Sequence, residues 1–97
     1  MLEHTAPGHA RLSGRLDMHS IAQMVQPLVA LARQEDLELD LSAISEADSA
    51  AVALLLQAKR ASLASGHRLT LTGWPASLLT LAQLYTLDDV LTAPIGT

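Results

Sequence analysis

The chain has 97 residues, 49% of them hydrophobic, with 10 acidic residues, 6 basic residues and no cysteine. This length predicts a single domain spanning residues 1–97, and the lack of cysteine excludes disulfides and thiolate metal sites. A net charge of −4, no basic run and only two aromatic residues, Trp74 and Tyr85, argue against nucleic-acid binding. No apolar run reaches the ~18 residues of a membrane span, and residues 1–4 lack a signal pattern. We therefore expect a soluble, intracellular protein without direct membrane insertion.

Two short runs with extended periodicity open the chain. Residues 2–6 and 9–13 are separated by Pro7-Gly8, a strong turn dipeptide, and the second run alternates apolar and polar residues. This pattern predicts an antiparallel hairpin. We expect Gly14 to end its second strand.

The next segment has helical periodicity. Apolar residues recur there at spacings of three and four: Ile21, Met24, Val25, Leu28, Leu31 and Ala32. They predict an amphipathic helix of about four turns, capped near Asp17 or Ser20 and closed by residues 34–36. Pro27 lies inside it and removes one backbone hydrogen bond, which predicts a kink or a late helix start.

The centre of the chain changes from strand to helix at Asp48-Ser49. Residues 37–41 alternate leucine with acidic residues, which predicts a strand with one wet and one dry face, followed by a short polar loop. A helix then runs to Ser65, with Gly66 as its stop. Its expected buried face comprises Val52, Leu55, Leu56, Lys59 and Leu63. Because free backbone N–H groups and a positive dipole end meet at Asp48-Ser49, we expect the functional site there.

The last third of the chain repeats this order. Residues 68–72 alternate again and predict a fourth strand, which Gly73-Trp74-Pro75 ends. A third helix opens at Pro75 or Ser77, and residues 87–91 could add a short turn. The expected inner face of this helix comprises Leu78, Leu81, Ala82 and Tyr85. The surroundings of three leucines outside the best helical faces stay open: Leu54, Leu79 and Leu84.

This order of elements predicts an α/β fold. A four-stranded mixed sheet would combine the antiparallel N-terminal hairpin with a parallel βαβαβ unit. Right-handed crossovers with all helices on one face give the strand order 1-2-3-4. Because the strands alternate instead of being continuously apolar, we expect helices mainly on one face and water on the other.

The unit of strand, loop, Asp-Ser and apolar helix resembles the STAS domain (sulfate transporter and anti-sigma factor antagonist), above all its MlaB-type branch in bacterial phospholipid-transport ABC systems. The likeness lies in residues 12–17 (LSGRLD), 39–42 (LDLS), 48–49 (DS), 53–56 (ALLL) and 80–91 (TLAQLYTLDDVL). It covers nearly the whole chain. The resemblance implies a STAS-like fold with an antiparallel hairpin followed by parallel strands.

The resemblance also implies a function. A MlaB-type protein is a non-enzymatic accessory subunit without a cofactor. It binds the cytoplasmic, MlaF-like ATPase subunit of a phospholipid ABC transporter that maintains outer-membrane lipid asymmetry, and through it meets the membrane permease indirectly. The implied location is cytoplasmic, peripheral at the inner membrane. The alternatives are an anti-sigma factor antagonist switched by phosphorylation of Ser49 and, more weakly, a STAS module that binds a small ligand.

Six residues form the expected partner-binding or regulatory site: Ser49, Asp48, Ala50, Ala51, Trp74 and Asp17. Ser49 takes the Ser/Thr position at which anti-anti-sigma members are phosphorylated, although Ser49 or Asp48 could also be a simple N-cap. The family commonly has glycine where this chain has Ala51, and a methyl group there could hinder a close partner backbone. Trp74 is expected at the same sheet edge, as a lid over the core or as an interface anchor.

Catalysis and metal binding are not expected. Asp40 and Asp48 have no His, Cys or Lys near them in sequence that would make an acid/base pair useful. The four histidines lack metal-ligand spacing, although His4 and His9 could approach across the hairpin. No Gly-rich phosphate loop exists, so the chain is not itself expected to be an ATPase.

Overall fold

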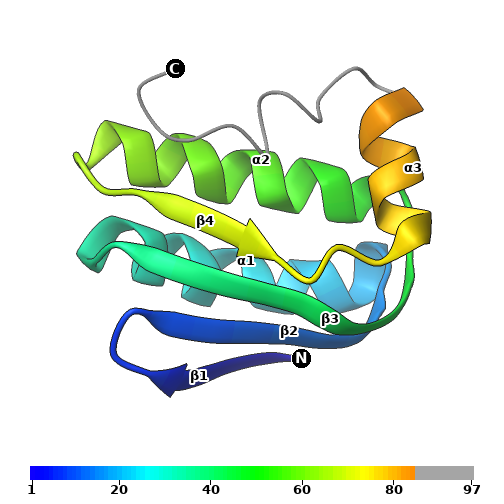
Figure 1. Cartoon of the computed structure of the whole chain (residues 1–97), viewed down its shortest axis with the longest axis horizontal. Coiled ribbons are helices and arrows are strands. Elements are labelled where there is room, and N and C mark those ends of the chain that lie inside the picture. The colour runs from blue at the N-terminus through cyan, green and yellow to red at the C-terminus, as the bar shows by residue number, and fades with distance from the viewer. Residues whose placement is uncertain (85–97) are drawn as a thin grey trace.

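The computed structural model describes residues 1–84, which form one mixed sheet and three helices (Figure 1). In chain order the elements are β1 (Leu2–Ala6), β2 (His9–Leu16), α1 (Met18–Gln34), β3 (Leu37–Ala47), α2 (Ser49–Ala64), β4 (Leu69–Thr72) and α3 (Ala76–Leu84). The strand order is β1-β2-β3-β4, with β1 antiparallel to β2 and the other pairs parallel. The predicted fold class and strand order are confirmed.

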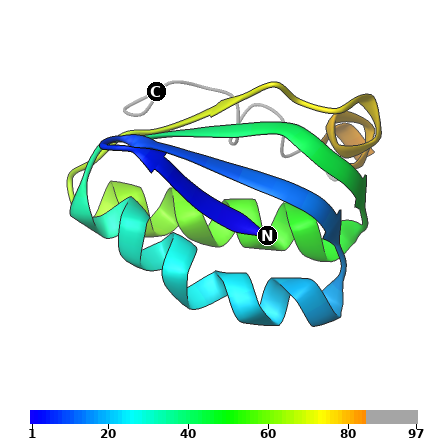
Figure 2. The same cartoon turned by 90° about the horizontal axis from the view of Figure 1, so that it is seen from below.

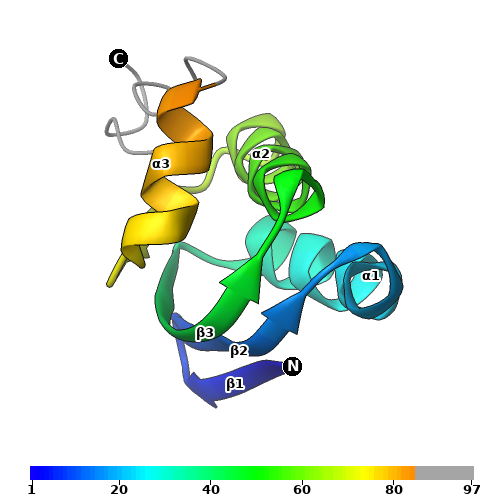
Figure 3. The same cartoon turned by 90° about the vertical axis from the view of Figure 1, so that its right-hand side faces the viewer.

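Helices α1 and α2 lie side by side on one face of the sheet (Figure 2). Helix α3 stands at the end of β4 and packs against α2 and β3 (Figure 3). Within residues 1–84 no helix covers the opposite face of the sheet, which carries the alternating charged and polar residues of β2 and β3. The prediction of helices mainly on one face is confirmed.

The core is built from aliphatic side chains where the sheet meets α1 and α2. Its largest fully buried members include Leu12, Leu16, Leu28, Leu37, Leu39, Leu41, Leu54, Leu55, Leu69 and Leu78. Leu54, left open by the sequence, is therefore a core residue. Leu63 was expected on the buried face but is 48% exposed. Because α2 contacts α1 and α3 as well as the sheet, its buried face is wider and is centred differently from the predicted stripe.

Strands β2 and β3 are longer than predicted. Gly14 does not end β2, and residues 42–47 are strand instead of the expected polar loop. The reason is mutual pairing: Ser13–Leu16 lie opposite Ala43–Ala47 in a parallel ladder with register shifts. Gly14 has a φ of 80° next to one such shift, a conformation that glycine adopts without a steric penalty.

Helix α1 begins directly after Asp17 and continues through Pro27, so the predicted late start is wrong. Pro27 faces solvent, as does Gln23, whose carbonyl loses its usual helical partner. Water can satisfy that carbonyl, which explains why the proline does not end the helix.

Helix α2 ends as predicted, with Ser65 as its C-cap and Gly66 following it. Its Lys59 is only 4% exposed, and Lys59 Nζ donates to the Leu69 carbonyl of β4 at 3.0 Å. Burial lowers the pKa of this ammonium group, because the charged form loses hydration. Lys59 thus joins α2 to the edge strand.

Helix α3 starts at Ala76, between the two predicted starts, with Leu78 and Ala82 buried and Leu79 and Leu81 partly buried. Tyr85 and the predicted turn at residues 87–91 lie outside the described residues, as does the side chain of Leu84.

Candidate functional site

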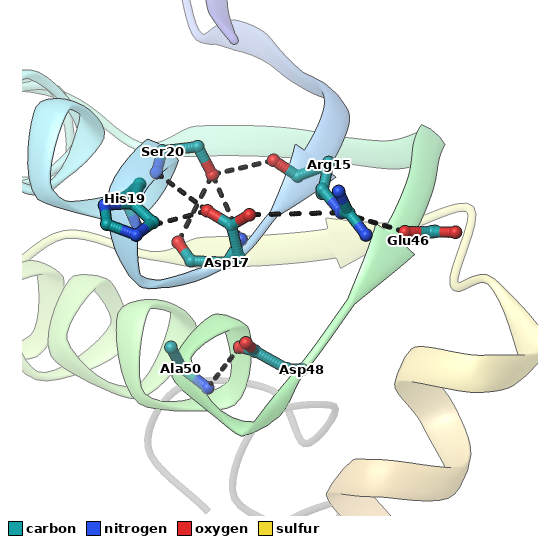
Figure 4. A network of polar contacts seen from close by, with 7 residues as sticks. All are labelled: Arg15, Asp17, His19, Ser20, Glu46, Asp48 and Ala50. Atoms are coloured by element: carbon teal, nitrogen blue, oxygen red, sulfur yellow. Dashed lines mark hydrogen bonds and ion pairs between the residues drawn. The ribbon is translucent and has the colours of Figure 1, made fainter.

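The candidate site lies where two strands end and two helices begin. Leu16 at the end of β2 is paired with Ala47 at the end of β3, and Asp48 N donates to the Leu16 carbonyl at 3.2 Å. The N-terminal ends of α1 and α2 therefore meet at one end of the sheet (Figure 4). We call residues 15–20 the first corner and residues 46–51 the second corner.

The first corner is held by a reciprocal cap. The Asp17 carboxylate accepts hydrogen bonds from the backbone N–H groups of His19 and Ser20, both at 3.0 Å. In return Ser20 Oγ accepts from Asp17 N at 3.0 Å and donates to the Arg15 carbonyl at 2.7 Å. Such a capping box provides hydrogen-bond acceptors for backbone N–H groups that have no partner within the first turn of a helix. Asp17 is thus the N-cap, one of the two residues predicted for that role.

The second corner has a simpler cap. Asp48 accepts from Ala50 N at 2.9 Å, so Asp48 and not Ser49 is the N-cap of α2. Ser49 is the first helical residue, exposed to solvent, and its hydroxyl makes no hydrogen bond to the rest of the described chain. A free hydroxyl at a helix start is available to a partner or a modifying enzyme.

The two alanines of the second corner have different roles. Ala50 is half-buried at the edge of the site, whereas Ala51 is 0% exposed and belongs to the core. The Ala51 methyl group therefore faces the protein interior and does not stand in the way of a partner backbone. This burial argues against the expectation that the departure from glycine could hinder docking.

Charged side chains connect the corners. Arg15 Nε lies 2.9 Å from Glu46 Oε2 and 3.9 Å from Asp17 Oδ2, which joins β2 to β3. The backbone N–H of Ser20, chiefly, holds the pKa of Asp17 below its ordinary value, helped by His19 and Arg15. A cavity of about 310 Å³ opens here, lined by Arg15, Leu16, Asp17, Glu46, Ala47 and Asp48. Three carboxylates and one guanidinium leave its rim with negative charge.

The β4–α3 connection, which carries Trp74, lies at the same end of the sheet as the two corners (Figure 1). Strand β4 pairs only with Leu37–Asp40, and a side chain on the next residue, Gly73, would meet Ser42. Trp74 is not among the residues lining the cavity. It is half-buried and packs against the core, which fits the predicted lid.

Sequence reasoning assigned no individual role to Arg15 or Glu46, and it considered Ser20 only as a possible helix cap. Ser20 had a local signal, because it follows the cap Asp17 at the spacing of a capping box. The Arg15–Glu46 pair had none, since it depends on the register between β2 and β3 after their bulges.

Other candidate groups lie apart from the corners. Asp40 is on the open face of the sheet, with Asp40 Oδ2 3.5 Å from Arg11 Nε. The backbone N–H of Ser42 is the main reason that the pKa of Asp40 lies below its usual range. His4 and His9 each face an acidic residue.

In the part of the chain that the structure describes, no three His, Asp or Glu residues are placed to hold a metal ion. Over residues 1–84, no helix has the length and hydropathy needed to cross a membrane.

Comparison with known proteins places this geometry in a family. The family model described as "Mlab, STAS domain" matches residues 3–93. One solved structure, "Structure of the Anti-Sigma Factor Antagonist SpoIIAA in its Unphosphorylated Form", superposes with a TM-score of 0.72 and 23% identity, covering 92% of this chain and 82% of that one. No curated protein sequence matches the chain. At this level of identity the structural likeness bears on the fold alone, and it confirms the STAS architecture.

Proposed function

Because this chain belongs to the MlaB-type STAS domain family, we propose that it is a non-enzymatic accessory subunit of a phospholipid ABC transporter. It binds the transporter's MlaF-like cytoplasmic ATPase and meets the permease only through that subunit. Its place is then the cytoplasmic side of the inner membrane, and its role is to support the transport that maintains outer-membrane lipid asymmetry. The match of the MlaB-type family model over residues 3–93 is the observation that carries this proposal.

The second corner is the proposed docking point. Asp48 and Ser49 are exposed, and the Ser49 hydroxyl is not used by the described chain. The neighbouring first corner adds Asp17 and the exposed side chain of Met18, which is 73% accessible. Exposed polar groups around an apolar side chain are a usual composition for an interface.

The proposed mechanism is a shift of population. An accessory subunit that binds one conformation of an ATPase dimer more tightly than another raises the share of that conformation. No chemistry is required of the subunit itself. A rigid surface is sufficient for such selective binding. The N-terminal ends of α1 and α2, which directly follow the paired strands β2 and β3, provide such a surface.

Co-expression with the cognate MlaF-like ATPase and permease tests the proposal. We expect the chain to co-purify with the ATPase and to change its rate of ATP hydrolysis. Absence of both effects would contradict the proposal.

Ser49→Glu locates the docking point. The added carboxylate joins Asp17, Glu46 and Asp48, and we expect it to weaken assembly about tenfold, which corresponds to ~1.4 kcal/mol. Unfolding would not explain the loss, because a negative charge at a helix N-terminus is favourable. The matched control is Ser65→Glu, the same change at the exposed opposite end of α2. If Ser49→Glu assembles as well as Ser65→Glu, docking occurs elsewhere.

A second candidate, an anti-sigma factor antagonist, is supported by the free Ser49 hydroxyl and by the fold that the chain shares with the antagonist SpoIIAA. It predicts that a cognate serine kinase adds one phosphate to this chain. Ser49→Ala would abolish that mass gain, whereas the accessory subunit would still assemble with its ATPase after the same substitution. One pair of measurements on Ser49→Ala therefore separates the two candidates.

A further inference from the structure

Strand β1 forms one edge of the sheet, on the side where α1 lies (Figure 3). Over residues 1–84 it pairs with β2 alone. Its outer edge therefore carries backbone N–H and C=O groups that no other strand of this part of the chain uses. An edge of this kind is a template on which a further strand can add.

The register between β1 and β2 identifies the unpaired backbone groups. Ser13 N donates to the Met1 carbonyl at 2.8 Å and Met1 N donates to the Ser13 carbonyl, so these two residues form a hydrogen-bonded pair. In an antiparallel ladder such pairs alternate with pairs that exchange no backbone hydrogen bonds. Along this ladder Leu2 and His4 belong to the second kind. The N–H and C=O groups of Leu2 and His4 therefore point away from β2.

A cavity of about 330 Å³ lies beside this edge, between β1 and α1 (Figure 2). None of the residues that line it has a charged side chain: Met1, Leu2, Ser20, Gln23, Met24 and Pro27. The helix stays uncharged along this stretch, since residues 18–32 include no Asp, Glu, Lys or Arg. The cavity between the two corners, in contrast, has four charged side chains in its lining. The space beside β1, which we call the β1–α1 groove, therefore suits uncharged side chains.

The lining of the β1–α1 groove is adaptable and offers one more acceptor. Met1 is 71% exposed and Met24 is 5% exposed, and methionine side chains are unbranched and adjust to different partners. Pro27 has no N–H, so the Gln23 carbonyl lacks the donor that a helix normally provides. Gln23 and Pro27 both line the groove, which places this carbonyl at its border.

We propose that the β1–α1 groove binds an extended, uncharged peptide segment of another protein, which adds to the sheet as a strand beside β1. The peptide backbone pairs with the outward groups of Leu2 and His4, and alternate side chains of the peptide enter the cavity. Main-chain pairing at a sheet edge, with pockets for alternate side chains, is an established mode of peptide recognition. The groove does not depend on the proposed docking function, because none of residues 46–51 lines it.

A second copy of this chain is a poorer occupant of the same edge. The symmetric antiparallel pairing that uses both Leu2 and His4 places Glu3 of one copy directly opposite Glu3 of the other. Like charges in that position are destabilising. An uncharged peptide meets no such repulsion.

Fluorescence anisotropy with a labelled peptide tests the proposal on the full chain. The probe is a short peptide, blocked at both ends, in which valine and threonine alternate. Two analogues carry N-methyl groups on either the valine or the threonine amides. A strand beside β1 uses only alternate N–H groups of the peptide, so we expect one analogue to bind within about twofold of the probe and the other at least about tenfold more weakly. Equal affinities of the two analogues, or no binding of the probe, would overturn the proposal.

A version of the probe with glutamate in place of valine tests the chemistry of the groove. It should bind at least about tenfold more weakly than the probe, because the groove has no cationic side chain to pair with a buried carboxylate. Unchanged affinity would show that the peptide's side chains do not enter the groove.

His4→Pro tests the edge from the side of this chain. It removes the outward N–H of His4, and edge strands tolerate proline where the N–H faces solvent. The matched control His4→Thr also loses the contact of 3.2 Å between His4 Nε2 and Glu35 Oε1 but keeps the N–H. We expect His4→Pro to bind the probe at least about tenfold more weakly than His4→Thr, with similar thermal midpoints. Equal binding would contradict strand addition at this edge.

Sedimentation velocity of the chain alone decides between a peptide and a second copy. We expect a monomer for both the original chain and His4→Pro. A dimer of the original chain that His4→Pro dissociates would overturn the proposal, because a second copy would then occupy the edge.

Discussion

The two corners of the site have the same architecture but are held differently. At the first corner, Asp17 and Ser20 cap each other, and Arg15 adds ion pairs to Asp17 and Glu46. At the second corner, Asp48 caps α2 through one backbone N–H, and the Ser49 hydroxyl makes no hydrogen bond to the rest of residues 1–84. A corner that satisfies its own polar groups is a support, whereas one that leaves a group free is available to a partner. This difference favours the second corner as the docking point.

Leu16→Ala should remove the support common to both corners and have the largest effect. Leu16 is 0% exposed, and its carbonyl accepts from Asp48 N. We expect the free energy of unfolding to fall by about 2–5 kcal/mol, because a cavity replaces packed atoms. Denaturant titration measures it, with Met18→Ala as the exposed neighbouring control, expected within ~0.5 kcal/mol. Similar costs for both variants would mean that the corners do not depend on this packing.

Replacing each cap residue with alanine tests whether the two caps contribute differently to the free energy of unfolding. Asp17→Ala loses two hydrogen bonds to backbone N–H groups and should cost about 1–2 kcal/mol of unfolding free energy. Asp48→Ala loses one and should cost about 0.5–1 kcal/mol. Denaturant unfolding of both variants under the same conditions gives the comparison. A larger cost for Asp48→Ala would reverse the assignment of support and docking point.

The two serines provide a finer test. Ser20→Ala leaves the Asp17 N–H without its acceptor and should cost about 1 kcal/mol. Ser49→Ala removes a hydroxyl that nothing in the described chain uses, so its effect should stay within ~0.5 kcal/mol. Equal destabilisation in a thermal melt would show that the Ser49 hydroxyl has an internal role.

Acid should weaken the first corner slightly. The pKa of Asp17 is lower in the folded protein than its ordinary value of 3.8, chiefly because Ser20 N–H donates to the ionised form. Its contribution to stability is therefore present above about pH 4 and is lost as the pH falls through the folded pKa. An NMR titration should give a midpoint below 3.8 for Asp17, and Asp17→Asn should make the acid-induced loss of stability shallower. A midpoint at or above 3.8 would contradict the observed hydrogen bonds.

Local patterns predicted the elements and one of the caps well. Alternating Leu37, Leu39 and Leu41 indicated β3, and Asp17 was a predicted cap because short oxygen-bearing side chains reach the next backbone N–H groups. At Asp48-Ser49 the same chemistry allowed either residue to cap. The backbone conformation decides for Asp48, whose extended φ of −114° and ψ of −170° turn its carboxylate toward Ala50 N.

Local sequence patterns could not predict the register in which strands distant in the chain pair with each other. A polar loop was expected after residue 41, yet residues 42–47 form strand because they pair with β2. The Arg15–Glu46 ion pair exists only in that register. The absence of Trp74 from the cavity lining likewise depends on where β4 pairs along β3.

The sequence by itself determined the kinds and order of the elements, because side-chain periods of two and 3.6 differ clearly over a few residues. It also placed Asp48 and Ser49 at the junction of a strand and a helix. Only the tertiary structure decided how far β3 extends, that Leu54 and Ala51 face the core, and that the Ser49 hydroxyl has no hydrogen-bond partner among the described residues. These outcomes depend on residues distant in the chain, whose contacts no local pattern records.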